Sequence, residues 1–150
     1  MITSSIFGHT KTGESVGAYC LENSRGSSVT VLDYGCTVQA LKVPNAQGGL
    51  TDVVLGYNTV SEYEENDGYL GAAIGRFANR IGKSEFTLNG KTHYLARNDG
   101  ENHLHGGIKG FDKYIWVASE KGNALELTRE SPDGEESYPG KLTVKITYEL

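Results

Sequence analysis

The chain has 150 residues, and its 14 Lys and Arg against 19 Asp and Glu give a formal net charge of −5. Nucleic-acid binding depends on clustered basic side chains that neutralise phosphates, whereas the basic residues here are scattered singly. The charge pattern therefore argues against a nucleic-acid partner, and against membrane-surface binding for the same reason. Because no apolar run approaches the ~20 residues of a membrane helix and the first fifteen residues lack a signal-peptide layout, we expect a cytoplasmic protein.

The composition predicts an all-β protein of one domain, since domains usually have roughly 100–200 residues. With 20 Gly, 9 Tyr and only 3 Pro, the chain is typical of short strands joined by tight turns. The two cysteines, Cys20 and Cys36, have no secretion signal before them. We therefore expect a reduced pair in strands rather than a disulfide.

Apolar and polar residues alternate along much of the chain, which favours strands over helices. The predicted strands are residues 28–34, 36–43, 52–55, 114–119, 124–129 and 141–150. Residues 59–67 form the one plausible helical turn or two. Asn89-Gly90, between residues 86–88 and 91–95, predicts a tight hairpin, because these residues accept the positive φ angles of a type I′ turn.

The last strand has one apolar face and one polar face, and the chain stops within this pattern. The apolar residues are Leu142, Val144, Ile146, Tyr148 and Leu150. This ending suggests a truncated chain or a fragment whose partner strands come later in a complete protein. An uncovered face and an open strand edge favour pairing with a second copy, so we expect a homo-oligomer through this strand.

Two polar stretches, residues 75–83 and 102–113, interrupt the alternation and are candidates for a site. Asn79 and Arg80 offer fixed hydrogen-bond donors to a polyhydroxyl or anionic ligand, although the more common role of such an arginine is to pair with a structural carboxylate. The order of residues in the first stretch is not that of a phosphate-binding loop.

His103 and His105 have a spacing that two metal ligands on a strand can share. We do not expect a metal, because no third Cys or His lies nearby and Gly106-Gly107 follows at once. Glycines at this point are more typical of a backbone that approaches a ligand closely. His105 is therefore predicted to position a ligand.

Several motifs together resemble the aldose 1-epimerase family. They are Gly75-Arg76-Phe77-Ala78-Asn79-Arg80-Ile81, Leu88-Asn89-Gly90-Lys91, Asn102-His103-Leu104-His105-Gly106-Gly107, and Gly110-Phe111-Asp112-Lys113 with Trp116. Flanking motifs extend the resemblance over nearly the whole chain: Val43-Pro44, Asp52-Val53-Val54-Leu55-Gly56-Tyr57, Ser131-Pro132-Asp133-Gly134-Glu135-Glu136 and Tyr138-Pro139-Gly140.

The resemblance implies part of a large twisted antiparallel β-sandwich, the supersandwich typified by galactose mutarotase. It also implies an aldose site with Asn79, Arg80 and His105 as substrate-binding residues, and His105 as the candidate catalytic residue, without cofactor or metal. The implied reaction interconverts the α and β anomers of a free hexose such as galactose or glucose. A base removes the anomeric hydroxyl proton while an acid protonates the ring oxygen, and the ring opens.

Members of that family are about twice as long or more, so the resemblance covers an N-terminal portion of one domain. It implies that the general acid, the base and a sugar-binding aspartate lie beyond residue 150, so we expect very weak catalysis by this chain alone. Ser137 stands where many relatives have glycine.

Two other functions remain open at this point. The first is a non-catalytic carbohydrate-binding or structural sandwich that uses Asn79, Arg80, His105 and Trp116 as a surface. The second is an epimerase of hexose 6-phosphates, which would need additional basic residues around the pocket.

Overall fold

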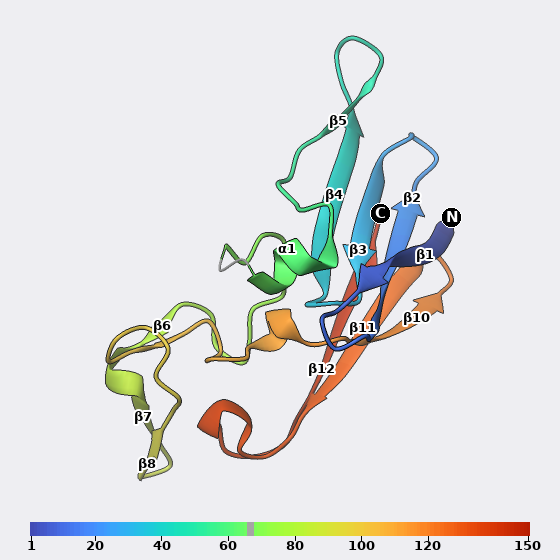
Figure 1. Ribbon diagram of the computed structural model, residues 1–150. Helices are drawn as coiled ribbons and strands as arrows, with labels where there is room; N and C mark the ends of the chain where they lie inside the picture. Colours follow the sequence, from blue (N-terminus) through green and yellow to red (C-terminus); the bar gives the residue numbers. More distant parts are fainter. Residues whose placement is uncertain (66–67) are drawn as a thin grey trace.

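The computed structural model describes residues 1–65 and 68–150 and consists mainly of antiparallel strands (Figure 1). The first sheet contains, in spatial order, β1 (Ile2–His9), β2 (Ser15–Glu22), β3 (Ser28–Leu32), β4 (Thr37–Pro44) and β5 (Leu50–Asp52). The second sheet contains β10 (Val117–Lys121), β11 (Ala124–Ser131) and β12 (Leu142–Glu149). Two short ribbons pair β6 (Arg80–Ile81) with β9 (His103–Leu104) and β7 (Glu85–Leu88) with β8 (Lys91–Tyr94). The helices are α1 (Val60–Glu65) and the 3-10 turns η1 (Gly82–Ser84), η2 (Phe111–Lys113) and η3 (Glu135–Ser137).

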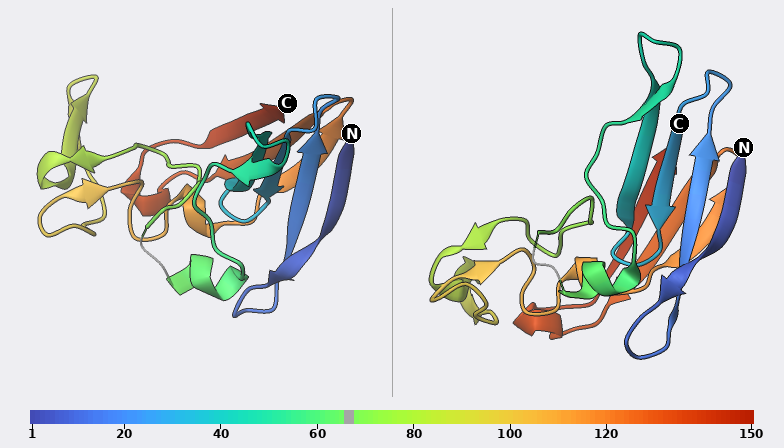
Figure 2. Two further views of the ribbon diagram at one scale, coloured as in Figure 1. Left: turned by 90° about the horizontal axis from the view of Figure 1, so that it is seen from above. Right: turned by 45° about the horizontal axis from the view of Figure 1, so that its top comes forward.

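The two larger sheets lie face to face and enclose the main core, as the views in Figures 1 and 2 agree. The core draws on both sheets and on the segment between them: Leu21, Val29, Val31, Cys36, Phe111, Trp116, Leu125 and Leu127. Trp116 is only 2% exposed, and its ring meets that of Phe111 edge-on at 5.7 Å. The expected all-β antiparallel sandwich is confirmed.

Helix α1 covers the opposite face of the first sheet. Val60 and Tyr63 of α1 pack there against Val16, Leu32 and Tyr34. β2 is therefore buried on both faces, so it lacks the alternation that reveals a strand in sequence. The edge strand β1 is mostly polar and exposed, and neither of these two strands was predicted.

Most predicted strands match the structure, but two are displaced. The strand predicted over residues 114–119 begins only at Val117 and runs to Lys121. The prediction for residues 52–55 is wrong, because the ladder ends at Asp52. The Asp52 carboxylate accepts hydrogen bonds from the N–H groups of Leu41 (3.0 Å) and Val54 (3.2 Å). The Asn89-Gly90 hairpin is confirmed, with φ angles of 51° and 76°. The helix predicted within residues 59–67 is observed over Val60–Glu65. Residues 66–67 of that prediction lie outside the described part of the chain.

The last strand alternates as predicted, but the expectation of an uncovered apolar face is wrong. Val144, Ile146 and Tyr148 pack against the main core, because the hairpin of β11 and β12 lies behind the first sheet (Figure 2). The Tyr148 hydroxyl also donates to the carbonyl of Cys36 at 2.8 Å.

Both cysteines are free thiols, as expected, although Cys36 lies in the turn before β4 rather than in a strand. None of the helices among the described residues is long and apolar enough to cross a membrane.

Candidate functional site

The two polar stretches meet where β6 pairs with β9. The register places Arg80 opposite Leu104 and Ile81 opposite His103. This ribbon stands apart from the two large sheets, beside the hairpin of β7 and β8 (Figure 1). Segments that are separate in sequence therefore form one polar surface.

Asn79 and His105 bind each other through reciprocal hydrogen bonds. The backbone N–H of Asn79 donates to Nδ1 of His105 at 3.0 Å. The backbone N–H of His105 donates to the carbonyl of Asn79 at 3.1 Å. Because Nδ1 accepts, the proton of the neutral imidazole sits on Nε2. The ring is also held by Tyr69, whose centroid lies 4.7 Å away.

The two histidines of the motif have different environments. His105 has a left-handed φ of 52°, so the extended geometry that would align it with His103 does not hold. His103 is fully buried and is bonded to the carbonyl of Ala96 and the hydroxyl of Tyr138, both at 2.7 Å. Within residues 1–65 and 68–150, no group of three or more His, Cys, Asp or Glu is arranged to hold a metal.

Arg80 forms the structural ion pair that its sequence context allowed, and much of its side chain stays exposed. Its Nε lies 2.6 Å from the Asp99 carboxylate, and its Nη1 lies 3.5 Å from Oδ1 of Asn79. The Arg80 side chain is 55% exposed, and exposed ion pairs contribute only about 0–1 kcal/mol to stability. Asp99 therefore orients the guanidinium more than it stabilises the fold.

A hollow of about 360 Å³ lies beside Arg80. Its other lining residues are Phe77, Ile81, Phe86 and Tyr138. The volume falls within the range of roughly 300–1,000 Å³ found for ligand pockets. The three predicted residues thus come together at a surface with a mainly apolar hollow on the Arg80 side.

Asn98 is a site residue that the sequence did not reveal. Its Oδ1 accepts the N–H of Leu104 at 2.7 Å, and its Nδ2 donates to the carbonyls of Leu104 and Gly107, both at 2.8 Å. These bonds fix the loop on both sides of His105. No local signal in the sequence distinguishes Asn98 from an ordinary turn residue.

The other arginine of the first polar stretch has a structural role. Arg76 donates from Nε to Oγ of Ser131 at 2.9 Å and from Nη2 to the carbonyl of Pro132 at 2.8 Å. Beside it, Arg129 forms a buried ion pair with Glu135. Burial opposes ionisation of Glu135, but hydrogen bonds, above all from Arg129, outweigh it and hold the pKa of this carboxyl below its usual value. These groups anchor the connection between β11 and β12.

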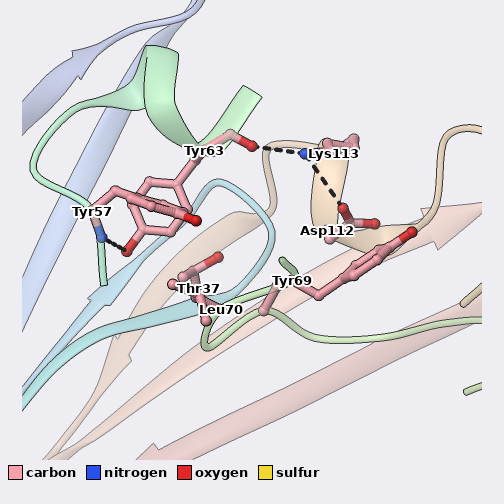
Figure 3. A pocket seen from close by; sticks show the side chains of 8 residues that line it. Thr37, Tyr57, Tyr63, Tyr69, Leu70, Asp112 and Lys113 are labelled. Atoms are coloured by element: carbon pink, nitrogen blue, oxygen red, sulfur yellow. Dashed lines mark hydrogen bonds and ion pairs between the residues drawn. The ribbon is translucent and has the colours of Figure 1, made fainter. Parts of the chain in front are cut away.

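A small cavity, which Tyr69 helps to line, lies near the site (Figure 3). The N–H of Tyr57 donates to the Tyr63 hydroxyl at 3.0 Å, and Nζ of Lys113 donates to the Tyr63 carbonyl at 2.7 Å. Burial raises the pKa of the nearby Asp112 carboxyl. The cavity measures about 10 Å³, which is about the space of one water, so it does not admit a sugar.

Trp116 does not belong to any binding surface. It lies in the core between the sheets, and its indole N–H donates to the Phe111 carbonyl at 3.2 Å. The suggestion that it lines a sugar surface is wrong, because the packing of the two sheets takes the indole inside.

The fold is a β-sandwich with a polar loop surface at one end, an architecture that by itself does not define a function. Residues 17–150 match the family described as aldose 1-epimerase, and the chain belongs to this family. It is 46% identical to galactose mutarotase of Sus scrofa over 99% of the chain and 44% of the relative. It is 36% identical to aldose 1-epimerase of Escherichia coli over 87% of the chain and 38% of the relative.

The solved structures agree. The crystal structure of galactose 1-epimerase from Lactobacillus acidophilus superposes with a TM-score of 0.84 at 30% identity, over all of this chain and 44% of the other. The aldose epimerase homologue of C. elegans gives the same TM-score at 29% identity. The chain spans less than half the length of these relatives.

Proposed function

We propose that this chain forms part of the aldose site of an enzyme that interconverts the anomers of a free hexose such as galactose or glucose. The observation that supports it best is the reciprocal bonding of Asn79 and His105 beside Arg80. These residues belong to a chain whose relatives are named galactose mutarotase and aldose 1-epimerase. Donors from separate loops then face one ligand, as a pyranose with several hydroxyls requires.

Each residue has a role that follows from its chemistry. His105 donates from Nε2 to the ring oxygen or a neighbouring hydroxyl, because Nδ1 is engaged by Asn79. Arg80 and the side chain of Asn79 bind further hydroxyls. Asp99 forms an ion pair with the Arg80 guanidinium and orients it.

Ring opening needs a base at the anomeric hydroxyl and an acid at the ring oxygen, and each contributes about 10²–10⁴-fold. The chain's own site residues bind and orient the sugar. The family resemblance implies that the acid and the base are not among these residues, so we propose weak catalysis by this chain alone.

The test is a titration of the 150-residue chain with D-galactose, followed by NMR, together with polarimetry of freshly dissolved α-D-galactose. We expect saturable binding that perturbs Asn79 and His105, with mutarotation only slightly above that of buffer. Lack of binding at millimolar galactose would contradict the site. A rate near that of full-length family members would contradict the assignment of acid and base elsewhere. Tight binding without any mutarotation would favour a carbohydrate-binding module.

We also propose that the edge of β12 pairs with a second copy of the chain. β12 is an edge strand of its sheet, and Leu142 remains 41% exposed. An unpaired edge is a template for another strand. Light scattering at micromolar concentration should show a dimer, and a stable monomer would contradict the proposal.

A further inference from the structure

Glu136, in the turn between β11 and β12, reaches back to the loop that carries His105. Its Oε2 accepts the N–H of Ile108 at 2.7 Å, and its Oε1 accepts the N–H of Lys109 at 3.1 Å. One carboxylate thus binds two consecutive backbone amides that lie 28 and 27 positions earlier in the chain. Hydrogen bonds to an ionised carboxylate are roughly twice as strong as neutral ones.

The two glycines after His105 make this approach possible. A Cβ on Gly107 would lie 2.1 Å from Oε2 of Glu136, and a Cβ on Gly106 would lie 1.6 Å from the carbonyl oxygen of Gly75. The loop is therefore pressed between the first polar stretch and the Glu136 carboxylate. Glycine has little conformational preference of its own, so the contacts on each side determine the path of this segment.

The turn that carries Glu136 has an uncommon backbone. Glu136 and Ser137 have φ angles of 49° and 70°, in the left-handed region that residues other than glycine seldom adopt. The N–H groups of Ser137 and Tyr138 close the turn on the carbonyls of Gly134 and Glu135, both at 2.9 Å. Such conformations persist only where the surroundings hold them, and they concentrate at functional sites.

We propose that Glu136 is a positioning residue for His105. By holding the amides of Ile108 and Lys109, it fixes the glycine pair and therefore the backbone of His105. Nδ1 then remains on the N–H of Asn79, and Nε2 carries the proton toward the ligand. The part of this proposal that concerns sugar affinity rests on the proposed function, whereas the part that concerns the imidazole does not.

The test compares Glu136→Ala and Glu136→Gln with the unaltered chain by ¹⁵N NMR of the histidine rings. His105→Ala assigns the signals. Glu130→Gln is the matched control, because Glu130 lies on the same hairpin and forms an exposed ion pair with Lys141 at 3.1 Å. The unaltered chain and the control should show His105 mainly as the Nε2–H tautomer. Glu136→Ala should show a mixture of tautomers, and Glu136→Gln an intermediate, since its amide oxygen accepts one of the two N–H groups.

Galactose titration of the same variants provides a second readout. If the competent arrangement of His105 falls to about a fifth of the population, the apparent Kd rises about fivefold. Failure of the unaltered chain to bind galactose would contradict the proposed function and leave the tautomer result standing. An unchanged His105 tautomer in folded Glu136→Ala would overturn the positioning role. Loss of folding in both Glu136 variants would also overturn it, because Glu136 would then be a structural residue.

Discussion

The backbone N–H of Asn79 lies 3.0 Å from Nδ1 of His105, and the bond in the opposite direction, from the His105 N–H to the Asn79 carbonyl, spans 3.1 Å. The pair fixes both the orientation and the tautomer of the imidazole. It also adds to the pairing of β6 with β9, through which the two polar stretches of the sequence meet. A proton added to Nδ1 would remove the acceptor, so this arrangement requires neutral His105.

Replacing His105 with alanine should weaken galactose binding and leave the fold intact. Loss of one hydrogen bond to the sugar corresponds to about 0.5–1.5 kcal/mol, or roughly a 2- to 13-fold rise in Kd. Calorimetric titration measures the change. His93→Ala is the control, because His93 stacks on Phe86 in the neighbouring hairpin, with centroids 5.2 Å apart. Equal losses in both variants would show that the effect is not specific to the site.

Asp99→Asn should separate orientation from stability at Arg80. The pair is largely exposed, so the free energy of unfolding should change by less than about 1 kcal/mol. Galactose affinity should fall measurably, because the guanidinium loses the carboxylate that orients it. Urea denaturation and sugar titration of the same sample give the two values. A large loss of stability with unchanged affinity would make the pair structural.

Asp33 should make the stability of the protein depend on pH. The residue is 8% exposed, and burial raises the pKa of its carboxyl to about 6. The native state therefore holds this proton more tightly than the unfolded chain does. Its contribution to stability is fully present below about pH 4 and is lost as the pH rises through about 6, by an amount on the order of 2–3 kcal/mol.

Asp33→Asn should remove that dependence, because an amide has no carboxyl proton to titrate. Its amide oxygen can still accept the N–H of Gly17, which lies 2.9 Å from the Asp33 carboxylate in the unaltered chain. The measurement is the difference in unfolding free energy between the two proteins from pH 4 to 7.5. The variant should gain relative stability as the pH rises. A difference that does not vary with pH would show that Asp33 titrates normally.

Trp116 should matter for stability and not for sugar binding. Trp116→Ala should lower the free energy of unfolding by about 3–5 kcal/mol, because it opens a cavity in the core. Trp116→Phe should cost less and retain galactose affinity. Since Trp116 is the one tryptophan, circular dichroism must follow the unfolding of both variants. A selective loss of affinity in Trp116→Phe would place the indole in the site after all.

The sequence by itself determined the elements whose signals are local. Alternation predicted β11 and β12, and Asn89-Gly90 predicted the hairpin, because backbone preference and the burial of one face act over a few residues. The motifs also indicated Asn79, Arg80 and His105 as candidate site residues through family resemblance. β2 was not predicted, because both of its faces are buried and its sequence therefore lacks the alternation of apolar and polar residues.

Only the tertiary structure decided which side chains support the site and which cover the core. Asn98, Tyr69 and Glu136 carry no local signal, since each acts on the His105 loop through contacts that depend on how distant segments pack. The same packing takes Trp116 inside and covers Tyr148 from within the chain. A local sequence pattern shows which face of a strand is apolar. Which segment packs against that face depends on the free energy of the whole fold.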